Sequence, residues 1–293
     1  MSTQPKRQPS IAVIIPACNA GSSFAGLLSE IARQTLQPAC KLVVDSASTD
    51  KTVELALQTG WNVLSIAREK FSHGGTRQQA VDTVLARHPS IEIIVFLTQD
   101  VRMQQRDALA QLVKSLEQKK DIGAAYGRQL PHDSASIYAA VEREFNYPPH
   151  SRVKSMASAA ELGIKTAFLS DSFAAYRVSA LKKIGGFPVV DICEDMHVAG
   201  RMLLAGYRIA YVAEATVKHS HEPSLHAIWQ RYRAMGRFQK SNSWLRENFG
   251  KADGEGLRLL RHQLTRVGEA EGVVGIAKII ILDAIRLLAF KLA

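Results

Sequence analysis

Two short apolar runs near the start of the chain each stop abruptly at a polar turn, and this pattern constrains the fold more than any other feature. Ile11–Ile15 is followed by Pro16-Ala-Cys-Asn19, and Leu42–Val44 is followed by Asp45. Short apolar runs bounded by turn residues are typical of strands buried on both faces of a parallel sheet. Ligands of such α/β sheets bind at the carboxyl ends of the strands. We therefore expect Asp45 to accept hydrogen bonds from a base or ribose.

The first 126 residues alternate strand and helix patterns. Strands are predicted at 11–15, 41–44, 61–66, 92–97 and 122–126, and helices near 22–34, 51–59, 75–87 and 106–118. This alternation predicts a right-handed βαβ sheet. Ser48 or Asp50 is placed to cap the helix that begins near residue 51. The pattern is looser over 130–172, and then predicts strands at 173–176 and 208–212 with helices at 178–184 and 194–205.

The composition allows one large α/β domain with an appendage, or two small domains. The chain has 293 residues, of which 46% are apolar and 22% charged, so a substantial core is expected. Its three cysteines, Cys18, Cys40 and Cys193, are odd in number and far apart, which favours a reducing compartment. No apolar signal-peptide core follows Lys6 and Arg7, so we expect a cytoplasmic protein.

The net charge of +10 is concentrated late in the chain, because residues 201–293 hold 15 Lys/Arg against 8 Asp/Glu. A basic surface of this kind binds nucleic acid, an anionic membrane or a phosphorylated substrate. No nucleic-acid motif accompanies it, and the aromatic residues are not spaced for base stacking. We therefore expect no nucleic-acid partner.

Two further segments at predicted strand ends or helix starts carry ligand-binding chemistry. Gln99-Asp100 ends a strand, and Asp100 either caps the next helix or holds Mg²⁺ or Mn²⁺, which takes one or two carboxylates plus phosphate oxygens. His73-Gly-Gly-Thr-Arg77 opens a helix. It is either a simple turn or a cradle whose backbone N–H groups, with His73 and Arg77, bind a diphosphate.

The second half of the chain contributes carboxylates, histidines and arginines. Glu194 and Asp195 either complement the dipole of the helix that they begin or include a catalytic base. His219 and His221, two residues apart, are either metal ligands or solvated loop residues. Arg233 and Arg237 lie one helical turn apart, and either clamp phosphate or form a solvated basic face.

The first two runs resemble the N-terminal signature of family 2 glycosyltransferases. Val13-Ile-Ile-Pro16-x-x-Asn19 and Asp45-x-x-Ser48-x-Asp50 follow one another about 30 residues apart, and the likeness extends over roughly residues 10–240. It implies an α/β fold of the GT-A type, with a mixed sheet flanked by helices and a helical C-terminal extension. The expected division is a flexible segment 1–9, a catalytic domain 10–222 and a helical region 223–293. Within the catalytic domain, 10–126 is the nucleotide-binding half and 127–222 the acceptor half.

The resemblance also implies roles for the residues that match it. Asp195 follows a Gly185-Gly-Phe187 segment and matches the family's catalytic base, with Glu194 as a supporting group on the acceptor side. Asp100 matches the metal ligand of the usual Asp-x-Asp site, in which Thr98 replaces the first Asp, and His219 completes the coordination. The expected donor-binding residues are Pro16, Asn19, Asp45, Ser48, Asp50, His73, Gly74, Thr76, Arg77, Gln99, Arg233 and Arg237.

The His-Gly-x-Thr-Arg loop together with Thr98-Gln-Asp100 is similar to the rhamnosyltransferase branch of the family. This implies an inverting enzyme that uses dTDP-L-rhamnose and a glycan or lipid-linked acceptor in bacterial surface polysaccharide synthesis. The same fold with a UDP-sugar donor remains an alternative, as does a non-catalytic membrane-binding scaffold. A nucleotidyltransferase would want a basic Gly-rich loop after the first strand, whereas Ala17–Gly21 contains no Lys or Arg.

The C-terminal stretch 272–292 is densely apolar, but Lys278, Asp283, Arg286 and Lys291 interrupt it, which argues against a transmembrane helix. One broad apolar helical face is formed by Val273, Ile276, Ala277, Ile280, Ile281, Ala284, Leu287 and Leu288. Such a face packs on the core or lies in a membrane interface. Nine Lys/Arg against three acidic residues over 228–266 favour peripheral contact with the inner leaflet.

Overall fold

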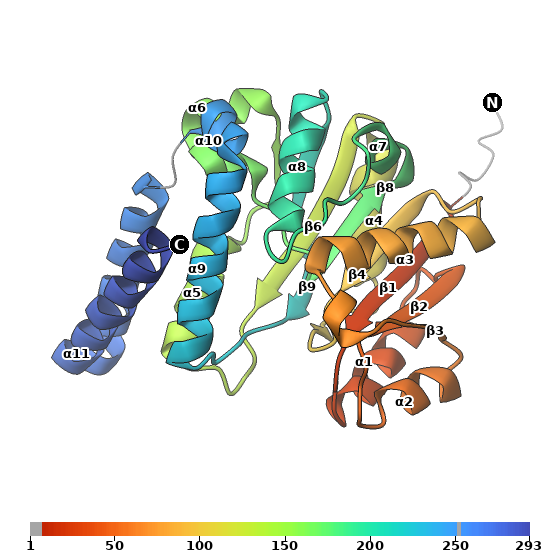
Figure 1. Ribbon diagram of the computed structural model, residues 1–293, viewed down its shortest axis with the longest axis horizontal. Coiled ribbons are helices and arrows are strands. Elements are labelled where there is room, and N and C mark those ends of the chain that lie inside the picture. Colours follow the sequence, from red (N-terminus) through yellow and green to blue (C-terminus); the bar gives the residue numbers. More distant parts are fainter. Residues whose placement is uncertain (1–7, 251–252) are drawn as a thin grey trace.

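The computed structural model describes residues 8–250 and 253–293. The flexible segment predicted over 1–9 therefore falls mainly on residues outside this described part. Within it, nine strands form one sheet in the order β3-β2-β1-β4-β8-β6-β9-β5, and β7 pairs with β9. Helices cover both faces of the sheet, and a separate group of helices ends the chain (Figure 1).

The first half of the sheet is parallel, as the alternating pattern predicted. Strands β1 (Ile11–Ala17), β2 (Cys40–Asp45), β3 (Asn62–Ser65) and β4 (Ile93–Leu97) pair in parallel. Their connections contain α1 (Ser23–Ala32), α2 (Thr52–Gln58), the 3-10 turn η1 (Arg68–Lys70) and α3 (His73–Arg87). The carboxyl ends of the four strands consequently lie at one edge of the sheet.

The second half makes the sheet mixed. After the short β5 (Arg102–Met103) and α4 (Ala108–Gln118) comes β6 (Ile122–Leu130). Strand β8 (Phe173–Arg177) lies between β4 and β6 and is antiparallel to both. Its start therefore lies beside the end of β4. Strands β6 and β9 (Arg208–Lys218) pair in parallel along their length, which explains why both continue beyond the predicted 122–126 and 208–212.

The segment with the looser pattern forms short elements. These are α5 (Ile137–Asn146), β7 (Arg152–Lys154), η2 (Met156–Ser158), α6 (Ala159–Leu162) and η3 (Gly163–Ala167). Helices α7 (Val178–Lys183) and α8 (Glu194–Leu204) follow as predicted, before and after the Gly185-Gly186-Phe187 segment.

Alternating side chains of the strands supply two cores, one on each face of the sheet. On one face Val95 and Phe173 pack with apolar residues of α1, α2 and α4, and on the other Phe96 and Tyr176 pack with residues of α3 and α8. Burying each of these large side chains contributes roughly 1.5–3 kcal/mol. These two cores fix the strands, and with them the edge of the sheet at which the strands end.

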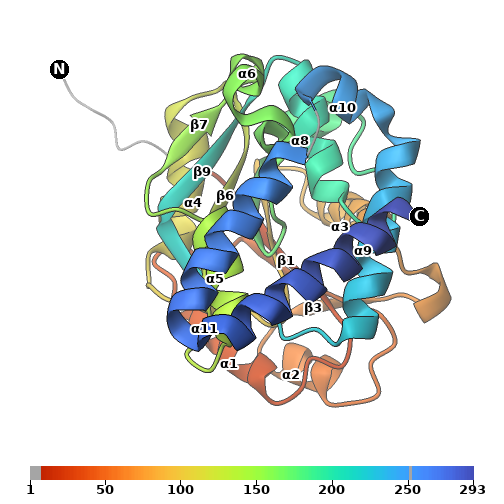
Figure 2. The same cartoon turned by 90° about the vertical axis from the view of Figure 1, so that its left-hand side faces the viewer.

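The C-terminal helices are α9 (Leu225–Ser241), α10 (Ser243–Phe249) and α11 (Asp253–Lys291). Helix α11 turns sharply at Gly272, whose φ is 61°. Figure 2 shows its two limbs diverging from that turn, the first along α5 and the second across α9. In residues 8–250 and 253–293 no helix is long and apolar enough to cross a membrane.

The second limb of α11 turns its apolar face away from the protein. Val273 is 82% exposed, Ile281 59% and Leu287 55%, whereas Ile279 on the opposite side is 0% exposed. The inward side also carries Arg286, which pairs with Glu142 of α5 and lies over the ring of Tyr232 in α9. The limb therefore presents apolar side chains on both sides, since Ile279 packs with Val141 and Val267 on the inward side while the broad face that includes Val273, Ile281 and Leu287 stays exposed.

Candidate active site

The loops after β1 and β2 are joined by side-chain hydrogen bonds. Asp45, at the tip of β2 and 4% exposed, accepts the N–H of Ser48 at 3.2 Å. The Ser48 hydroxyl accepts the N–H of Asn19 at 2.8 Å, and the Asn19 side-chain oxygen accepts the N–H of Thr49 at 2.8 Å. Asn19 has a φ of 49°. The structure thus brings Asn19, Asp45 and Ser48 together, close to Pro16 in β1.

Asp50 and Gln99 reinforce the same edge. One carboxylate oxygen of Asp50 accepts the N–H of Gly21 at 2.9 Å, and the other accepts the N–H of Thr52 at 3.0 Å. The Thr52 hydroxyl, which also donates to Asp50, is the main cause that lowers the pKa of this carboxyl. The Gln99 amide accepts the N–H of Cys18 at 2.7 Å and donates to its carbonyl at 3.2 Å. These contacts position the loops around a ligand before any ligand binds.

Asp100, His219 and His221 form a cluster with the geometry of a metal site. Their ligand atoms all lie within 4.8 Å of one another. The Nε2 atom of His219 is 3.4 Å from the Asp100 carboxylate, and that of His221 is 3.2 Å from it. Burial raises the pKa of Asp100, but the hydrogen bond and charge of His219 and the charge of His221 outweigh it and leave the pKa below its ordinary value. Asp100 therefore offers an anionic oxygen beside two imidazoles.

The buried amide of Gln129, 1% exposed, orients His219. The side-chain oxygen of Gln129 accepts from Arg143 at 2.8 Å, and its NH₂ group donates to the Ser170 hydroxyl at 2.8 Å. That oxygen also lies 2.8 Å from Nδ1 of His219, so this network assigns the imidazole proton to Nδ1. The other ring nitrogen, Nε2, faces Asp100 and is the atom that ligates a metal once it has lost its proton, which is the arrangement of a metal-ligating histidine held by a second hydrogen bond.

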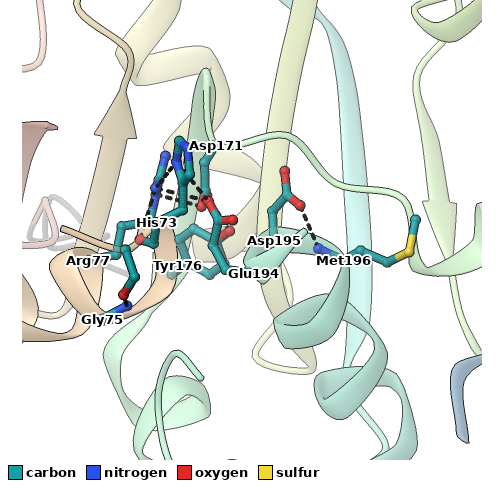
Figure 3. Close-up of polar contacts among 9 residues, drawn as sticks. His73, Gly75, Arg77, Asp171, Tyr176, Glu194, Asp195 and Met196 are labelled. Atoms are coloured by element: carbon teal, nitrogen blue, oxygen red, sulfur yellow. Dashed lines mark hydrogen bonds and ion pairs between the residues drawn. The ribbon is translucent and has the colours of Figure 1, made fainter. Parts of the chain in front are cut away.

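Arg77 lies beneath the carboxylates that begin α8. Its side chain is 4% exposed; Nε is 2.8 Å from Asp171 and Nη1 is 2.9 Å from Glu194. Burial alone would lower the pKa of Arg77, but the charges of Asp171 and Glu194 raise it. Tyr176 also donates to Asp171. Arg77 was predicted to bind the donor, and its guanidinium instead faces two protein carboxylates (Figure 3).

Glu194 and Asp195 start α8 after Cys193, whose φ is 62°. Glu194 points towards Arg77, while the partly buried Asp195 points away from it and accepts the N–H of Met196 at 2.7 Å (Figure 3). Burial and the negative charges of Glu194 and Asp171 raise the pKa of Asp195 well above its ordinary range. A carboxylate in such surroundings is a stronger base than a solvated one.

The glycine-bearing loop packs on the segment before α8. A Cβ on Gly74 would lie 1.8 Å from the Pro188 carbonyl oxygen, so only glycine fits. The N–H of Gly74 donates to the Val190 carbonyl at 3.0 Å, and Thr76 is 2% exposed. The side chain of His73 is 48% exposed, and its Nδ1 is 4.0 Å from Glu194. Of the loop residues predicted to contact the donor, His73 is the one that reaches solvent.

The arginines of α9 take different positions. Arg233 is partly buried and Arg237 is exposed. Burial lowers the pKa of both His73 and His221, and the nearby positive charge of Arg231 lowers each further. The positive charge of Arg231 therefore reaches both His73 and His221.

Sequence reasoning missed Asp171 and Gln129 and did not select His221 or Arg231. Asp171 stands in a polar Ser-Asp-Ser triplet in front of β8, a signal that points to the site only once β8 is known to be antiparallel. Gln129 lies in the part of β6 beyond the predicted strand end. His221 was considered beside His219, and Arg231 shares the basic run of Arg233.

Comparison with known proteins gives concordant matches. The family model for Glycosyl transferase family 2 matches residues 12–185. The O-antigen chain rhamnosyltransferase WbaN of Salmonella anatum is 42% identical over 258 residues, covering 87% of this chain and 80% of the relative. The O-antigen chain rhamnosyltransferase RfbN of Salmonella typhimurium strain LT2 is 43% identical over 256 residues, with the same coverage.

Among solved structures, the mannosyltransferase PcManGT from Pyrobaculum calidifontis in complex with GDP-Man and Mn²⁺ superimposes with a TM-score of 0.63. It is 20% identical, and the match covers 98% of this chain and 88% of that one. The glucosyl-3-phosphoglycerate synthase from Mycobacterium tuberculosis in complex with Mn²⁺, UDP and glucosyl-3-phosphoglycerate gives a TM-score of 0.54 at 18% identity, covering 82% of this chain and 86% of that one. At these identities the likeness establishes a shared fold.

Proposed function

The chain belongs to glycosyl transferase family 2, and from that premise we propose that it transfers L-rhamnose from dTDP-L-rhamnose to a glycan, with inversion and with the help of a divalent cation. Its GT-A fold and its glycosyltransferase class are those expected from the sequence. Two relatives that are 42% and 43% identical bear the name O-antigen chain rhamnosyltransferase, which supports the choice of donor sugar and a surface glycan as acceptor.

The observation that carries the proposal is that two polar networks, one holding the metal-ligand cluster and one holding Glu194 of α8, meet at neighbouring residues of the chain, Ser170 and Asp171. The first network runs from His219 through Gln129 to the Ser170 hydroxyl. In the second, the next residue, Asp171, joins Arg77 and Glu194. A cation on one side of a bound donor and a base on the other are what an in-line displacement at a sugar carbon requires.

In the proposed reaction Asp195 takes the proton of the acceptor hydroxyl. The acceptor oxygen then forms a bond to the anomeric carbon of the sugar, while the bond from that carbon to the diphosphate oxygen breaks and the nucleoside diphosphate leaves. One displacement from the opposite side inverts the anomeric centre. Asp45 holds the base or ribose of the nucleotide, and Glu194 and Asp171 keep Asp195 basic.

The ligand set of Asp100, His219 and His221 fits a divalent cation. When bound, that cation offsets the negative charge of the diphosphate. Two imidazole nitrogens beside one carboxylate favour a transition ion such as Mn²⁺ over Mg²⁺, which prefers oxygen ligands. Because His219 is already oriented by Gln129, we expect measurable Mn²⁺ affinity before the donor binds.

We place the acceptor at the inner face of the cytoplasmic membrane, linked to lipid. The support is the outward apolar face of α11, which includes Ile280, Ile281, Leu287 and Leu288, each more than half exposed. Nine Lys/Arg against three acidic residues over 228–266 add attraction to an anionic leaflet.

The test is turnover of a panel of nucleotide sugars with Mn²⁺, with Mg²⁺ and with a chelator. We expect a preference for dTDP-L-rhamnose, loss of turnover with the chelator, and loss in Asp195→Asn. The matched control is Asp121→Asn, an exposed carboxylate at the opposite edge of the sheet, which should retain activity. Preference for a UDP-sugar would refute the donor, and a folded protein that turns over no donor would favour a scaffold.

A further inference from the structure

A cavity of about 540 Å³ lies between the catalytic domain and the C-terminal helices. Its apolar walls come from α5, η3, α8, α9 and both limbs of α11, represented by Phe145, Ile164, Met196, Met235, Leu260 and Leu287. Figure 2 shows these helices gathered on one side of the molecule. The volume falls within the range of roughly 300–1,000 Å³ typical of ligand pockets.

The wall of the cavity includes Met196, the residue that follows Asp195 in the chain. The N–H of Met196 donates to the Asp195 carboxylate at 2.7 Å. An occupant that touches the Met196 side chain therefore lies one residue from the proposed base. The occupant belongs with the acceptor, because Asp195 faces the acceptor hydroxyl in the proposed reaction.

The charged groups in the wall are already paired with each other. Lys165 is 3.0 Å from Glu255, and Arg286 is 3.0 Å from Asp283. Lys165 also lies 4.0 Å from the ring centre of Phe145. Such pairs need no charge from a ligand. Most of the remaining wall is apolar, with Asn146 and Gln239 as its uncharged polar residues, so the cavity suits a hydrocarbon better than a sugar or phosphate.

The outer end of the cavity opens onto the apolar face of α11. Leu257 and Leu287 line the cavity and are nevertheless 49% and 55% exposed. Leu287 adjoins Leu288, which is 53% exposed, and both belong to the outward face described above. Leu287 therefore belongs both to the cavity wall and to the outward apolar face of α11.

We propose that this cavity binds the first part of the hydrocarbon tail of a lipid-linked acceptor, and so sets its glycan head at Asp195. The inference rests on the proposed function and adds to it a binding site for the acceptor lipid. The tail enters between the limbs of α11 from the membrane face, and the walls remove it from water. Each methylene buried in this way strengthens binding about fourfold.

The test is calorimetric binding of geranylgeranyl phosphate and geranyl phosphate, with 20 and 10 carbon atoms in their tails, below their micellar concentrations. We expect the longer tail to bind at least about tenfold more tightly. Met235→Gln, a nearly isosteric change in the wall, should weaken its binding about tenfold or more. Gln239→Leu, which replaces a polar wall residue, should strengthen it, a result that misfolding cannot produce. Leu57→Gln, at an exposed apolar residue of α2 outside the wall, should leave it unchanged.

Equal affinity for the two tails, or equal affinity in Met235→Gln and the native chain, would overturn the proposal. A lysophospholipid of equal tail length that competes as well as geranylgeranyl phosphate would show a general acyl site and overturn the acceptor assignment. Donor turnover on the same samples separates the two hypotheses. Normal turnover without tail binding refutes the cavity alone, and tail binding without turnover of any donor refutes the proposed function.

Discussion

Replacing Arg77 with methionine tests whether the buried ion cluster organises the active site. Arg77 is 4% exposed and bridges Asp171 and Glu194, which are 3% and 5% exposed. Breaking one buried ion pair costs about 3–5 kcal/mol, because the remaining charge keeps its desolvation cost. Arg77→Met breaks two pairs at once. However, one carboxyl can take up a proton, so we expect about 3–5 kcal/mol rather than twice that amount.

The loss of stability in Arg77→Met should increase as the pH rises. Burial and the negative charge of Glu194 raise the pKa of Asp171, whereas the positive charge of Arg77 lowers it. Removing Arg77 should therefore raise this pKa further. The folded variant then holds a proton that the unfolded chain releases above a pH of about 4. Its stability relative to the native chain therefore falls as pH rises, by up to about 1.4 kcal/mol per pH unit.

The assay is urea unfolding of the full chain at pH 6 and pH 8, followed by fluorescence. Arg77→Lys should lie between the native chain and Arg77→Met, because it keeps the charge but loses the planar fork. Arg208→Met is the matched control, since Arg208 pairs with Asp121 at the surface and should change stability little. A loss below about 1 kcal/mol at pH 8 for Arg77→Met, or an equal loss at both pH values, would refute the reasoning.

Three further predictions concern catalysis, metal binding and the fold. Asp195→Asn should lower kcat about 10²–10⁴-fold. Glu194→Gln removes a negative neighbour of Asp195 and should shift the acidic limb of the kcat/KM profile to lower pH. Steady-state kinetics would check both effects. Gln129→Leu should weaken Mn²⁺ binding about 10–100-fold in calorimetry, because His219 loses its orienting acceptor. Burial and the charges of Lys165 and Arg152 lower the pKa of Lys154 to about 7, so the unfolding free energy should rise from pH 7 towards pH 10, and Lys154→Met should flatten that rise.

The fold was predictable because the sequence pattern that specifies its first strands is local. Each of the first strands is a short apolar run that ends in a polar turn, and parallel strands bring these ends to one edge. Asp45 and Asp100 could be found from that rule alone, before any distance was known. The position of Asp195 needed the family resemblance, because adjacent carboxylates at a helix start also occur where they only complement the dipole.

The residues that hold the site in place were not predictable, because their contacts depend on the direction of strand β8. Arg77 at a helix start suggested a phosphate ligand, and Gly74 suggested a backbone cradle. Strand β8 runs antiparallel between β4 and β6, and this brings Asp171 to the same edge as Asp100. Arg77 then pairs with Asp171, and the N–H of Gly74 donates to Val190. Sequence periodicity does not show which distant residue in the chain a charged side chain pairs with.

The orientation of α11 shows a further limit of periodicity. An apolar face spaced at helical intervals establishes that a helix has two sides, but not which side meets the protein. Here the inward side carries Arg286, which pairs with Glu142 of α5 and lies over the ring of Tyr232 in α9. Turning the limb over would bury the apolar face but separate Arg286 from Glu142 and Tyr232, whereas its pair with Asp283 lies within the helix and would persist. The outward apolar face is therefore specified by the contacts of the inward side, those of Arg286 and the packing of Ile279, which helical periodicity does not report.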